Sequence, residues 1–338
     1  MDTNKIIIRM PNWLGDAVMA TAALEDVKSH FSSSQVTVLC HEAIASLLQA
    51  NPSIDHYLVF DKNKKESEKK RIYQALQEER FDLGILLTNS FSSAWWFYKG
   101  GVKSRVGYNS HFRRPLLTSA VPIRKNHEKE HQVIAYKHLL SPLGIPLSTT
   151  APHLYVRTEE EAQAKKLLAS LQISSSHILI GINPLAAYGD AKCWPLDRFR
   201  ALSEKLLQNP QVRIIYIGDP SGRESIEKNL LGLGPRVVSL AGKTSLRELL
   251  ALMNQCTCFV TNDSGPMHIA SALHIPLVAL FGSTNEIKTG PYEKAIVIHK
   301  HVACSPCYQR HCPIDFRCMK TIAAEEVFQA IKTEIPAL

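Results

Sequence analysis

The stretch from residue 259 to residue 285 constrains the fold most, because it reads as a complete strand–turn–helix–strand unit. The apolar run that enters it at 258–260 is long enough for a buried strand of a parallel sheet. The turn at 261–266 combines N-cap residue types with a glycine and a proline that suits a first helical turn. Apolar residues at helical spacing follow, and 275–281 predicts the next strand. In an open α/β sheet, a polar turn at the carboxyl end of a strand is where ligands bind.

The polar turn of this unit is a candidate anion site. The free N–H groups at a helix start stabilise a phosphate by about 0.3–2 kcal/mol. Asp263, Ser264 and the backbone of Gly265 lie in the turn, and His268 follows closely enough to add a charge-assisted contact. The alternative is an ordinary capped helix that carries a surface histidine.

Strand and helix patterns alternate through both halves of the chain. Residues 144–152 are rich in turn-forming types and look like a linker, and 338 residues exceed the size at which one core keeps growing. We therefore expect an α/β fold of two doubly wound parallel sheets, in domains 1–155 and 156–338, whose strand ends face a central cleft. The expected strands are 5–9, 35–40, 56–60, 81–88, 177–183, 212–218, 236–240, 258–260 and 275–281.

Composition narrows the class of protein. No apolar run approaches the ~20 residues that span a bilayer, and we expect no signal peptide before the first strand. The eight cysteines then indicate reduced thiols or metal ligands rather than a disulfide framework, so we expect a cytoplasmic protein. A net charge of +8 favours an anionic partner, whether nucleic acid, an anionic membrane surface or a phosphorylated substrate.

The first half carries a polar junction and two basic clusters. Gly15 and Asp16 lie at the junction between the first expected strand and the helix after it, just as the turn at 261–266 lies between a strand and a helix. The basic clusters, at 62–71 and 103–125, are interleaved with aromatic side chains and predict a surface for an anionic acceptor. A merely solvated basic face is the alternative. The arginines that we assign to the acceptor are Arg105, Arg113 and Arg114.

The second half carries a long loop, 183–195, between a strand and a helix. Its Lys192 precedes an expected helix start at Pro195, and a lysine there is a point charge placed for a phosphate, with a plain surface lysine as the alternative. Two other phosphate motifs are excluded. Residues 242–244 resemble the end of a P-loop, but Val237 occupies the required upstream glycine position, and no G-x-G-x-x-G follows a strand.

Two patterns resemble metal sites. H-E-x-x-H occurs at 127–131, but its neighbours are polar, whereas zinc helices of that type need a protected apolar setting. A run of four cysteines permits a tetrahedral zinc site, although we favour a loop packed by reduced thiols and assign no metal. These cysteines are Cys304, Cys307, Cys312 and Cys318.

Five ordered motifs resemble those of the ADP-heptose:lipopolysaccharide heptosyltransferases, and the second heptosyltransferase in particular. They are residues 9–19, 183–195, 261–268, 281–284 and 304–307. The resemblance covers nearly the whole chain and implies two Rossmann-like domains in the GT-B architecture, an amino-terminal one that binds the acceptor and a carboxyl-terminal one that binds ADP-heptose. The chain departs from the usual family pattern at Ala22, Leu185, Cys193 and His274.

The resemblance also implies an activity. It is an inverting, metal-independent transfer of L-glycero-D-manno-heptose from ADP-heptose to the inner-core heptose of lipopolysaccharide, without a cofactor. Asp16 resembles the catalytic base, Lys192 the diphosphate contact with a catalytic role, and Asp263 the sugar contact. The other donor-binding residues implied are Ser264, Gly265, His268 and, as the ribose-binding acid, Glu224. The implied partner is a lipid-anchored acceptor, met at the cytoplasmic face of the inner membrane, and no nucleic acid.

The residue types suit this chemistry. Inverting transfer needs a base for the acceptor hydroxyl and compensation for the charge that develops on the departing ADP. Lys192, His268 and the helix start at Gly265 supply that compensation without metal, and closure of the domains would bring Asp16 to the donor. Two alternatives stay open. A nucleotide-sugar epimerase has no need of a basic, aromatic acceptor face, and a non-catalytic nucleotide-sugar-binding protein has no need of Asp16.

Overall fold

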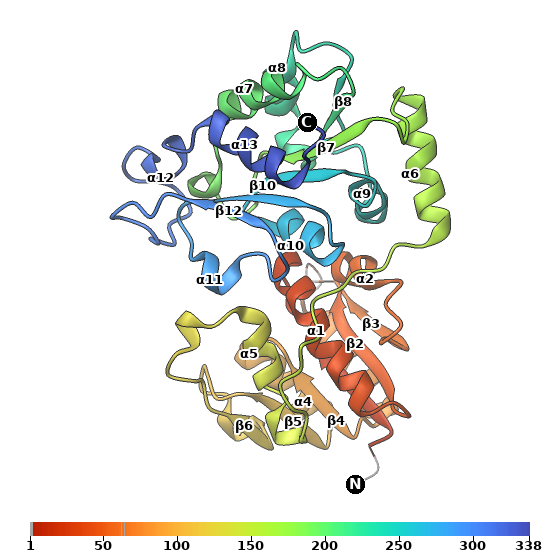
Figure 1. The fold of residues 1–338 in the computed structure, drawn as a ribbon. Helices are drawn as coiled ribbons and strands as arrows, with labels where there is room; N and C mark the ends of the chain where they lie inside the picture. Colours follow the sequence, from red (N-terminus) through yellow and green to blue (C-terminus); the bar gives the residue numbers. More distant parts are fainter. Residues whose placement is uncertain (1–2, 62, 64) are drawn as a thin grey trace. The chain divides into compact units, whose positions relative to one another are not determined.

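The computed structural model of the protein describes residues 3–61, 63 and 65–338. The chain divides after Tyr155 into two compact units, called here unit 1 and unit 2. Residues 145–157, which include most of the expected linker, form neither helix nor strand. Each unit consists of a sheet with helices packed against it (Figure 1). Lys62 and Lys64, from the first basic cluster, lie outside the described residues.

Unit 1 is built on a parallel sheet in the order β3-β2-β1-β4-β5-β6. The first and fourth strands are neighbours, so the strand order reverses at the centre of the sheet, as in a doubly wound nucleotide-binding fold. The strands are β1 (Lys5–Arg9), β2 (Gln35–His41), β3 (His56–Phe60), β4 (Leu83–Leu86), β5 (Ser104–Tyr108) and β6 (Ser119–Val121).

Helices cover both faces of this sheet because its strands are apolar on both sides. The longest, α1, buries an alanine-rich run between Ala17 and Val27, which lets its backbone approach the sheet closely. On the other side, Phe97 and Ile72 pack against strand residues such as Ile7. The α-helices of unit 1 are α1 (Leu14–His30), α2 (Glu42–Leu48), α3 (Lys65–Glu79), α4 (Phe91–Lys99) and α5 (Gln132–His138).

Unit 2 repeats the plan, with a parallel sheet in the order β12-β11-β10-β7-β8-β9. The strand order reverses between β7 and β10, again at the centre. Both of these strands are buried along their whole length. The strands are β7 (Ile178–Asn183), β8 (Val212–Tyr216), β9 (Val237–Ser239), β10 (Cys258–Asn262), β11 (Leu277–Phe281) and β12 (Ile296–His299).

The core of unit 2 includes Trp194, which is 1% exposed and donates from Nε1 to the carbonyl of Ile322 at 3.1 Å. Its ring meets Phe199 edge to face, with centroids 4.7 Å apart. This anchors the end of the long loop that the sequence singled out. The α-helices of unit 2 are α6 (Thr158–Ser170), α7 (Leu196–Leu206), α8 (Arg223–Leu230), α9 (Leu246–Met253), α10 (Gly265–Ala272), α11 (Glu286–Thr289), α12 (Arg317–Lys320) and α13 (Ala324–Glu334).

The expected α/β class with two doubly wound parallel sheets is confirmed, and every expected strand forms. Sequence reasoning missed β5, β6 and β12. The strand β5 contains an arginine and a glycine, β6 is very short, and β12 is an edge strand that is only partly buried. Edge and short strands carry a weak apolar signal because one side of each faces solvent. Among the described residues, no helix is both long and apolar enough to cross a membrane.

Candidate active site

The carboxyl ends of β7 and β10 meet where the strand order of unit 2 reverses. Ligands of doubly wound sheets bind at such a reversal, because the connections leaving the two strands run to opposite faces of the sheet. The loop that contains Lys192 leaves β7 here, and the turn that contains Asp263 leaves β10. The two polar connections that the sequence singled out in this half therefore lie at one point of the fold.

Two asparagines tie the loop to the turn. Asn183, the last residue of β7, donates from Nδ2 to Thr261 Oγ1 at 3.1 Å and to Ser264 Oγ at 2.9 Å. Asn262, the last residue of β10, accepts from the backbone N–H of Trp194 at 2.9 Å. Both amides are buried, so these bonds are made away from competing water. Sequence reasoning gave neither asparagine a role, although an amide that ends an apolar strand is a usable signal.

Lys192 and Asp263 form an ion pair at this junction. Lys192 Nζ lies 2.5 Å from Asp263 Oδ2, and the Thr284 hydroxyl donates to the same oxygen at 2.5 Å. The ammonium also lies 4.6 Å from the ring centroid of Tyr188, within cation–π range. The side chain of Asp263 is 3% exposed, and a buried carboxylate needs such partners because its desolvation is costly. The structure thus brings together the residues predicted for the diphosphate and for the sugar.

A second loop supports the one that carries Lys192. The backbone N–H of Ala191 donates to the carbonyl of Arg310 at 3.1 Å, and the Tyr188 hydroxyl donates to the carbonyl of Tyr308 at 2.6 Å. Gly189 has a φ of 151°, and a Cβ there would lie 2.1 Å from the Arg310 carbonyl oxygen. Only glycine fits this close approach, so the position of Lys192 depends on the segment after Cys307.

The start of α10 is left without a hydrogen bond from its N-cap side chain. Ser264, one of the N-cap residue types in the turn, is the N-cap residue, but its side chain makes no capping bond. Its hydroxyl instead accepts from Asn183 and lies 3.1 Å from Thr261 Oγ1. Gly265 is the first helical residue, and His268 is buried in the same helix. This arrangement suits an anion at the helix start.

Glu224 lies apart from this network, exposed in the first turn of α8. The residue beside that helix is Leu185, where the family pattern has glycine. A Cβ at Gly222 would meet Leu185 Cδ1 at 2.0 Å, so Leu185 fills the space over the glycine that precedes α8. The ribose role of Glu224 stays a prediction.

In unit 1, Asp16 lies in the first turn of α1 and is half-buried. The N-cap of this helix is Trp13, so Asp16 does not cap it. The Tyr136 hydroxyl donates to Asp16 Oδ1 over 3.5 Å. Burial, followed by the negative charge of Asp16, raises the pKa of Tyr136 well above its usual value, so Tyr136 remains a neutral donor.

The strand–helix connection before Asp16 is held by residues that sequence reasoning missed. Arg9 is buried, donates to Asn12 Oδ1 at 2.7 Å, and lies over the ring of Phe60 at 4.7 Å. His41 Nε2 lies 2.8 Å from the carbonyl oxygen of Asn12. Burial lowers the pKa of Arg9 to about 10, which leaves it charged at neutral pH. This connection follows β1 at the reversal of the unit 1 sheet, which is the equivalent of the unit 2 site.

The three arginines assigned to the acceptor differ in environment. Arg113 is fully buried, and its guanidinium donates to the carbonyls of Tyr108 and Thr88. Arg105 is half-buried and donates from Nε to the carbonyl of Leu116 at 2.7 Å. Arg114 is exposed. The acceptor role stays a prediction for all three, and Arg114 is the one whose charge faces solvent.

The predicted cysteine run is spread over several environments. Cys304 and Cys307 are exposed, Cys312 Sγ accepts from the backbone N–H of Phe316 at 3.2 Å, and Cys318 is buried. Burial raises the pKa of the Cys318 thiol. Among the described residues, the set of side chains spaced closely enough to hold a metal ion is a different one, formed by Glu286, His299 and His301.

Residues 69–316 match the model of glycosyltransferase family 9, the heptosyltransferases. The chain belongs to this family. It is 28% identical over 333 residues to lipooligosaccharide heptosyltransferase 2 of Campylobacter jejuni, a match that covers 97% of this chain and 98% of that one. It is 30% identical over 307 residues to lipooligosaccharide heptosyltransferase 2 of Haemophilus ducreyi, covering 87% and 88%.

The family's architecture agrees with the two sheets. The solved structure of the Escherichia coli ADP-heptose lipopolysaccharide heptosyltransferase II matches with a TM-score of 0.84 and 25% identity, over 98% of this chain and 99% of that one. The resemblance carried by the five sequence motifs is therefore confirmed, as is a GT-B fold of two Rossmann-like domains. The membership of glycosyltransferase family 9 also disfavours the epimerase and the non-catalytic alternatives.

Proposed function

We propose that this family 9 glycosyltransferase transfers L-glycero-D-manno-heptose from ADP-heptose to the inner-core heptose of lipopolysaccharide, with inversion at the anomeric carbon. The similar E. coli structure is that of an enzyme named for ADP-heptose and lipopolysaccharide. The observation that carries the proposal is the group of Lys192, Asp263 and Thr284 beside the open start of α10.

This group suits a nucleotide diphosphate sugar because it combines both signs of charge. Lys192 and the backbone donors of the α10 start bind the diphosphate, and His268 adds a contact from the same helix. Asp263 and Thr284 supply an acceptor and a donor for sugar hydroxyls. Glu224 accepts from the ribose hydroxyls of the adenosine.

The reaction then needs one proton transfer and one displacement. The Asp16 carboxylate takes the proton of the acceptor hydroxyl, and the oxygen attacks the anomeric carbon from the face opposite the diphosphate. The bond between the anomeric carbon and the diphosphate oxygen breaks, and ADP leaves with the electron pair. Lys192 and the helix start offset the negative charge that grows on that oxygen. The Tyr136 hydroxyl, which donates to Asp16, orients the carboxylate.

Because Lys192 and the helix start are fixed donors, no cation has to bridge the diphosphate. Transfer is therefore metal-independent. A lysine and a helix start do for the leaving group what a bound cation does in other glycosyltransferases. Turnover is expected without added Mg²⁺ or Mn²⁺, and a rate that rises steeply with either ion would contradict it.

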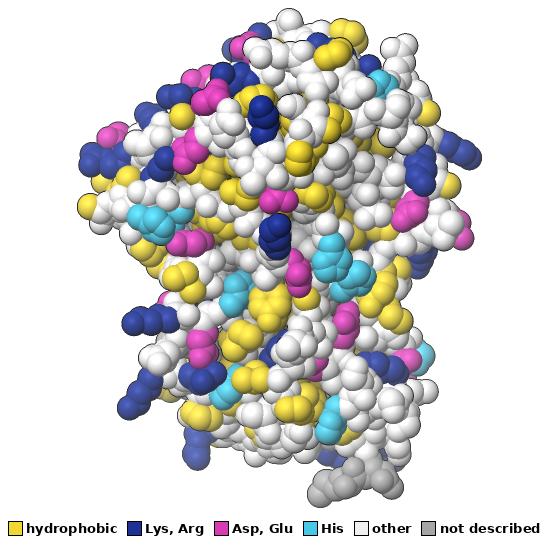
Figure 2. Space-filling model, in the orientation of Figure 1, with side chains coloured by type: hydrophobic (Ala, Val, Ile, Leu, Met, Phe, Trp, Pro, Cys, Tyr) yellow, Lys and Arg dark blue, Asp and Glu magenta, His cyan; other side chains and the backbone are white. Residues whose placement is uncertain are grey.

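The proposed acceptor is held in the membrane by its lipid, so we expect the protein to work in peripheral contact with the inner membrane. We expect it to do so from the cytoplasm and to bind no nucleic acid. On the face drawn in Figure 2, Lys and Arg side chains project along the edge of unit 1 that carries β6 in Figure 1. Such a surface attracts the phosphates and carboxylates of an anionic acceptor.

The proposal is tested by calorimetric titration of the full chain with ADP, UDP and GDP, followed by transfer assays. We expect ADP to bind best. With ADP-heptose and a lipopolysaccharide truncated after its first inner-core heptose, mass spectrometry should show the acceptor heavier by one heptose. Isomerised ADP-heptose without transfer would indicate an epimerase, and tight binding without turnover would indicate a binding protein. Either result would overturn the proposal.

A further inference from the structure

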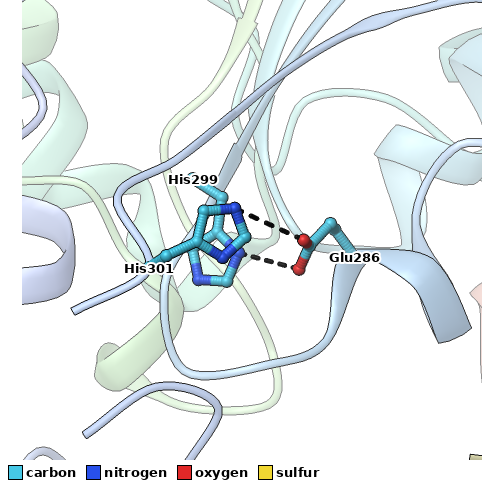
Figure 3. A group of neighbouring side chains, drawn as sticks. All are labelled: Glu286, His299 and His301. Atoms are coloured by element: carbon cyan, nitrogen blue, oxygen red, sulfur yellow. Dashed lines mark hydrogen bonds and ion pairs between the residues drawn. The ribbon is translucent and has the colours of Figure 1, made fainter. Parts of the chain in front are cut away.

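Two histidines and a glutamate converge on one point of unit 2, outside the network of Lys192 and Asp263 (Figure 3). His299 is the last residue of β12 and pairs in register with Phe281, the last residue of β11. Glu286 begins α11, in the connection that leaves β11. His301 follows the end of β12, so both histidines and the glutamate come from adjacent strand ends.

The three side chains have the spacing of metal ligands. His299 Nδ1 lies 2.7 Å from Glu286 Oε2, and His301 Nε2 lies 3.6 Å from Glu286 Oε1. All three ligand atoms lie within 4.8 Å of one another. Ligand atoms about 2.0–2.1 Å from a tetrahedral zinc ion are separated by about 3.3 Å, which falls between these distances. Small side-chain movements are enough to accept an ion.

The hydrogen bonds of His299 leave a place for a cation. The Ser305 hydroxyl donates to the carbonyl of Gly282, so Ser305 Oγ can only accept from His299 Nε2, 2.9 Å away. The ring proton is therefore on Nε2, and Nδ1 is a lone pair in the neutral ring. Yet Nδ1 faces Glu286 Oε2, which only accepts when it is ionised. Two facing acceptors require a proton or a metal ion between them.

Two further features distinguish a metal from a second proton. His301 lies close to His299, with ring centroids 4.1 Å apart and ring planes tilted by 40°, and its nitrogen also faces the carboxylate (Figure 3). The backbone of His301 has a φ of 45°, in the left-handed region. Non-glycine residues seldom adopt this region, and those that do cluster at ligand sites. A simple ion pair between His299 and Glu286 has no need of His301. The Ser305 contact also matches the outer hydrogen bond that usually orients a ligating histidine.

We propose that Glu286, His299 and His301 bind one divalent cation of the zinc class, through His299 Nδ1, His301 Nε2 and the carboxylate, with water at the remaining position. Two imidazoles and one carboxylate suit zinc and neighbouring transition metals, whereas Mg²⁺ and Ca²⁺ prefer all-oxygen sites.

The ion would have a structural role close to the donor site. It would join the end of β12 to the connection that follows β11, and Thr284 in that connection donates to Asp263. The chain further along after β12 also bonds to that connection, because the backbone N–H of Tyr308 donates to the carbonyl of Ser283 at 2.8 Å. Metal binding would therefore stabilise the loop that presents Thr284, and it would take no part in the displacement itself.

The test is zinc binding by the full chain, measured by elemental analysis after purification without chelator and by competition with a fluorescent zinc chelator. We expect about one zinc per chain. Glu286→Gln and His301→Ala should lose it, and Ser305→Ala should weaken affinity about 10–100-fold, the usual effect of an outer hydrogen bond. His311→Ala is the matched control, because His311 faces the Asp190 carboxylate at 3.3 Å and is not one of the three clustered side chains. It should retain the metal.

The cysteine run is the competing ligand set. The Cys304→Ser and Cys307→Ser double variant should keep its zinc, and the Co²⁺-loaded protein should lack thiolate-to-cobalt charge-transfer absorption. Loss of metal in the cysteine variant, or a strong charge-transfer band, would assign the metal to the thiols and overturn the proposal. No stoichiometric zinc in a folded wild-type protein would also overturn it. Circular dichroism of each variant separates metal loss from misfolding.

Discussion

Lys192 Nζ and Asp263 Oδ2 lie 2.5 Å apart. The residue proposed to contact the diphosphate and the residue proposed to contact the sugar are therefore direct partners. Thr284 shares the same carboxylate oxygen. A diphosphate that binds Lys192 must compete with the Asp263 carboxylate for the ammonium. Donor binding therefore exchanges one buried ion pair for another, which keeps the lysine charged and oriented throughout.

This competition predicts opposite effects of one substitution on binding and on turnover. Asp263→Asn removes the competing charge, so ADP should bind as tightly as to wild type or more tightly. Transfer from ADP-heptose should fall, because the sugar loses its carboxylate contact. Calorimetry with ADP and a kcat measurement with ADP-heptose check the two parts. A loss of ADP affinity with unchanged kcat would reverse the two assignments.

Lys192→Ala should weaken ADP binding by about 1–3 kcal/mol, the range for losing a hydrogen bond to a charged group. Titration calorimetry measures this directly. The matched control is Lys205→Ala, which removes an exposed lysine paired with Glu325 at 2.7 Å in the same unit. It should leave ADP affinity unchanged, as exposed ion pairs contribute little. Equal affinities for both variants and wild type would remove Lys192 from the donor site.

Asp16→Asn should lower kcat by about 10²–10⁴-fold while ADP affinity persists, because an amide cannot take the acceptor proton. The substitution also removes a first-turn carboxylate from α1, which costs about 0.3–1 kcal/mol of stability. Asp197→Asn, in the first turn of α7, is the control for that helix effect and should keep wild-type kcat. Near-normal turnover of the Asp16 variant at saturating substrates would exclude it as the base.

Arg114→Glu should raise the KM for the lipopolysaccharide acceptor about 5-fold or more and leave ADP affinity unchanged, since a basic side chain near an anionic surface is worth about 1 kcal/mol. Lys165→Glu, an exposed reversal on α6 of unit 2, is the control. The buried Arg113 is unsuitable for this test, because its loss leaves backbone carbonyls unpaired and should destabilise unit 1. An unchanged acceptor KM for the Arg114 variant would assign its charge to solvation.

Glu160 should contribute to stability in a pH-dependent way. The bond from Arg247, with Nε 2.8 Å from Oε1, lowers the pKa of Glu160 and joins α9 to α6. A lowered folded-state pKa means that the contribution is present above the unfolded value of about 4.3 and is lost as pH falls through the folded value. Wild type should therefore exceed Glu160→Gln in urea stability at about pH 7 and approach it near about pH 3. A constant difference across that range would show that the carboxylate charge contributes nothing.

The local pattern of the sequence was enough to predict the buried elements. Strands such as β7 and β10 are continuous apolar runs, and their polar ends stand out in the sequence because a buried strand tolerates few amides or carboxylates. The strands β5 and β12, which are only partly buried, were missed because they lack such a continuous apolar run. Their side chains mix types, and their pairing is decided by neighbours far away in the chain.

The fold class, the motif order and the identity of the polar connections could be predicted from the sequence, since these depend on local periodicity and on residue type. Which of these side chains meet depends on the packing of the whole chain. Asp263 is 71 residues from Lys192, and Asn183 is 78 from Thr261, so their contacts arise from strand order alone. That packing also decided that Arg113 is a buried brace while Arg114 faces solvent, although the two are adjacent in the chain. Long-range pairing, and which of two adjacent arginines is buried, are properties of the packed chain that no local pattern encodes.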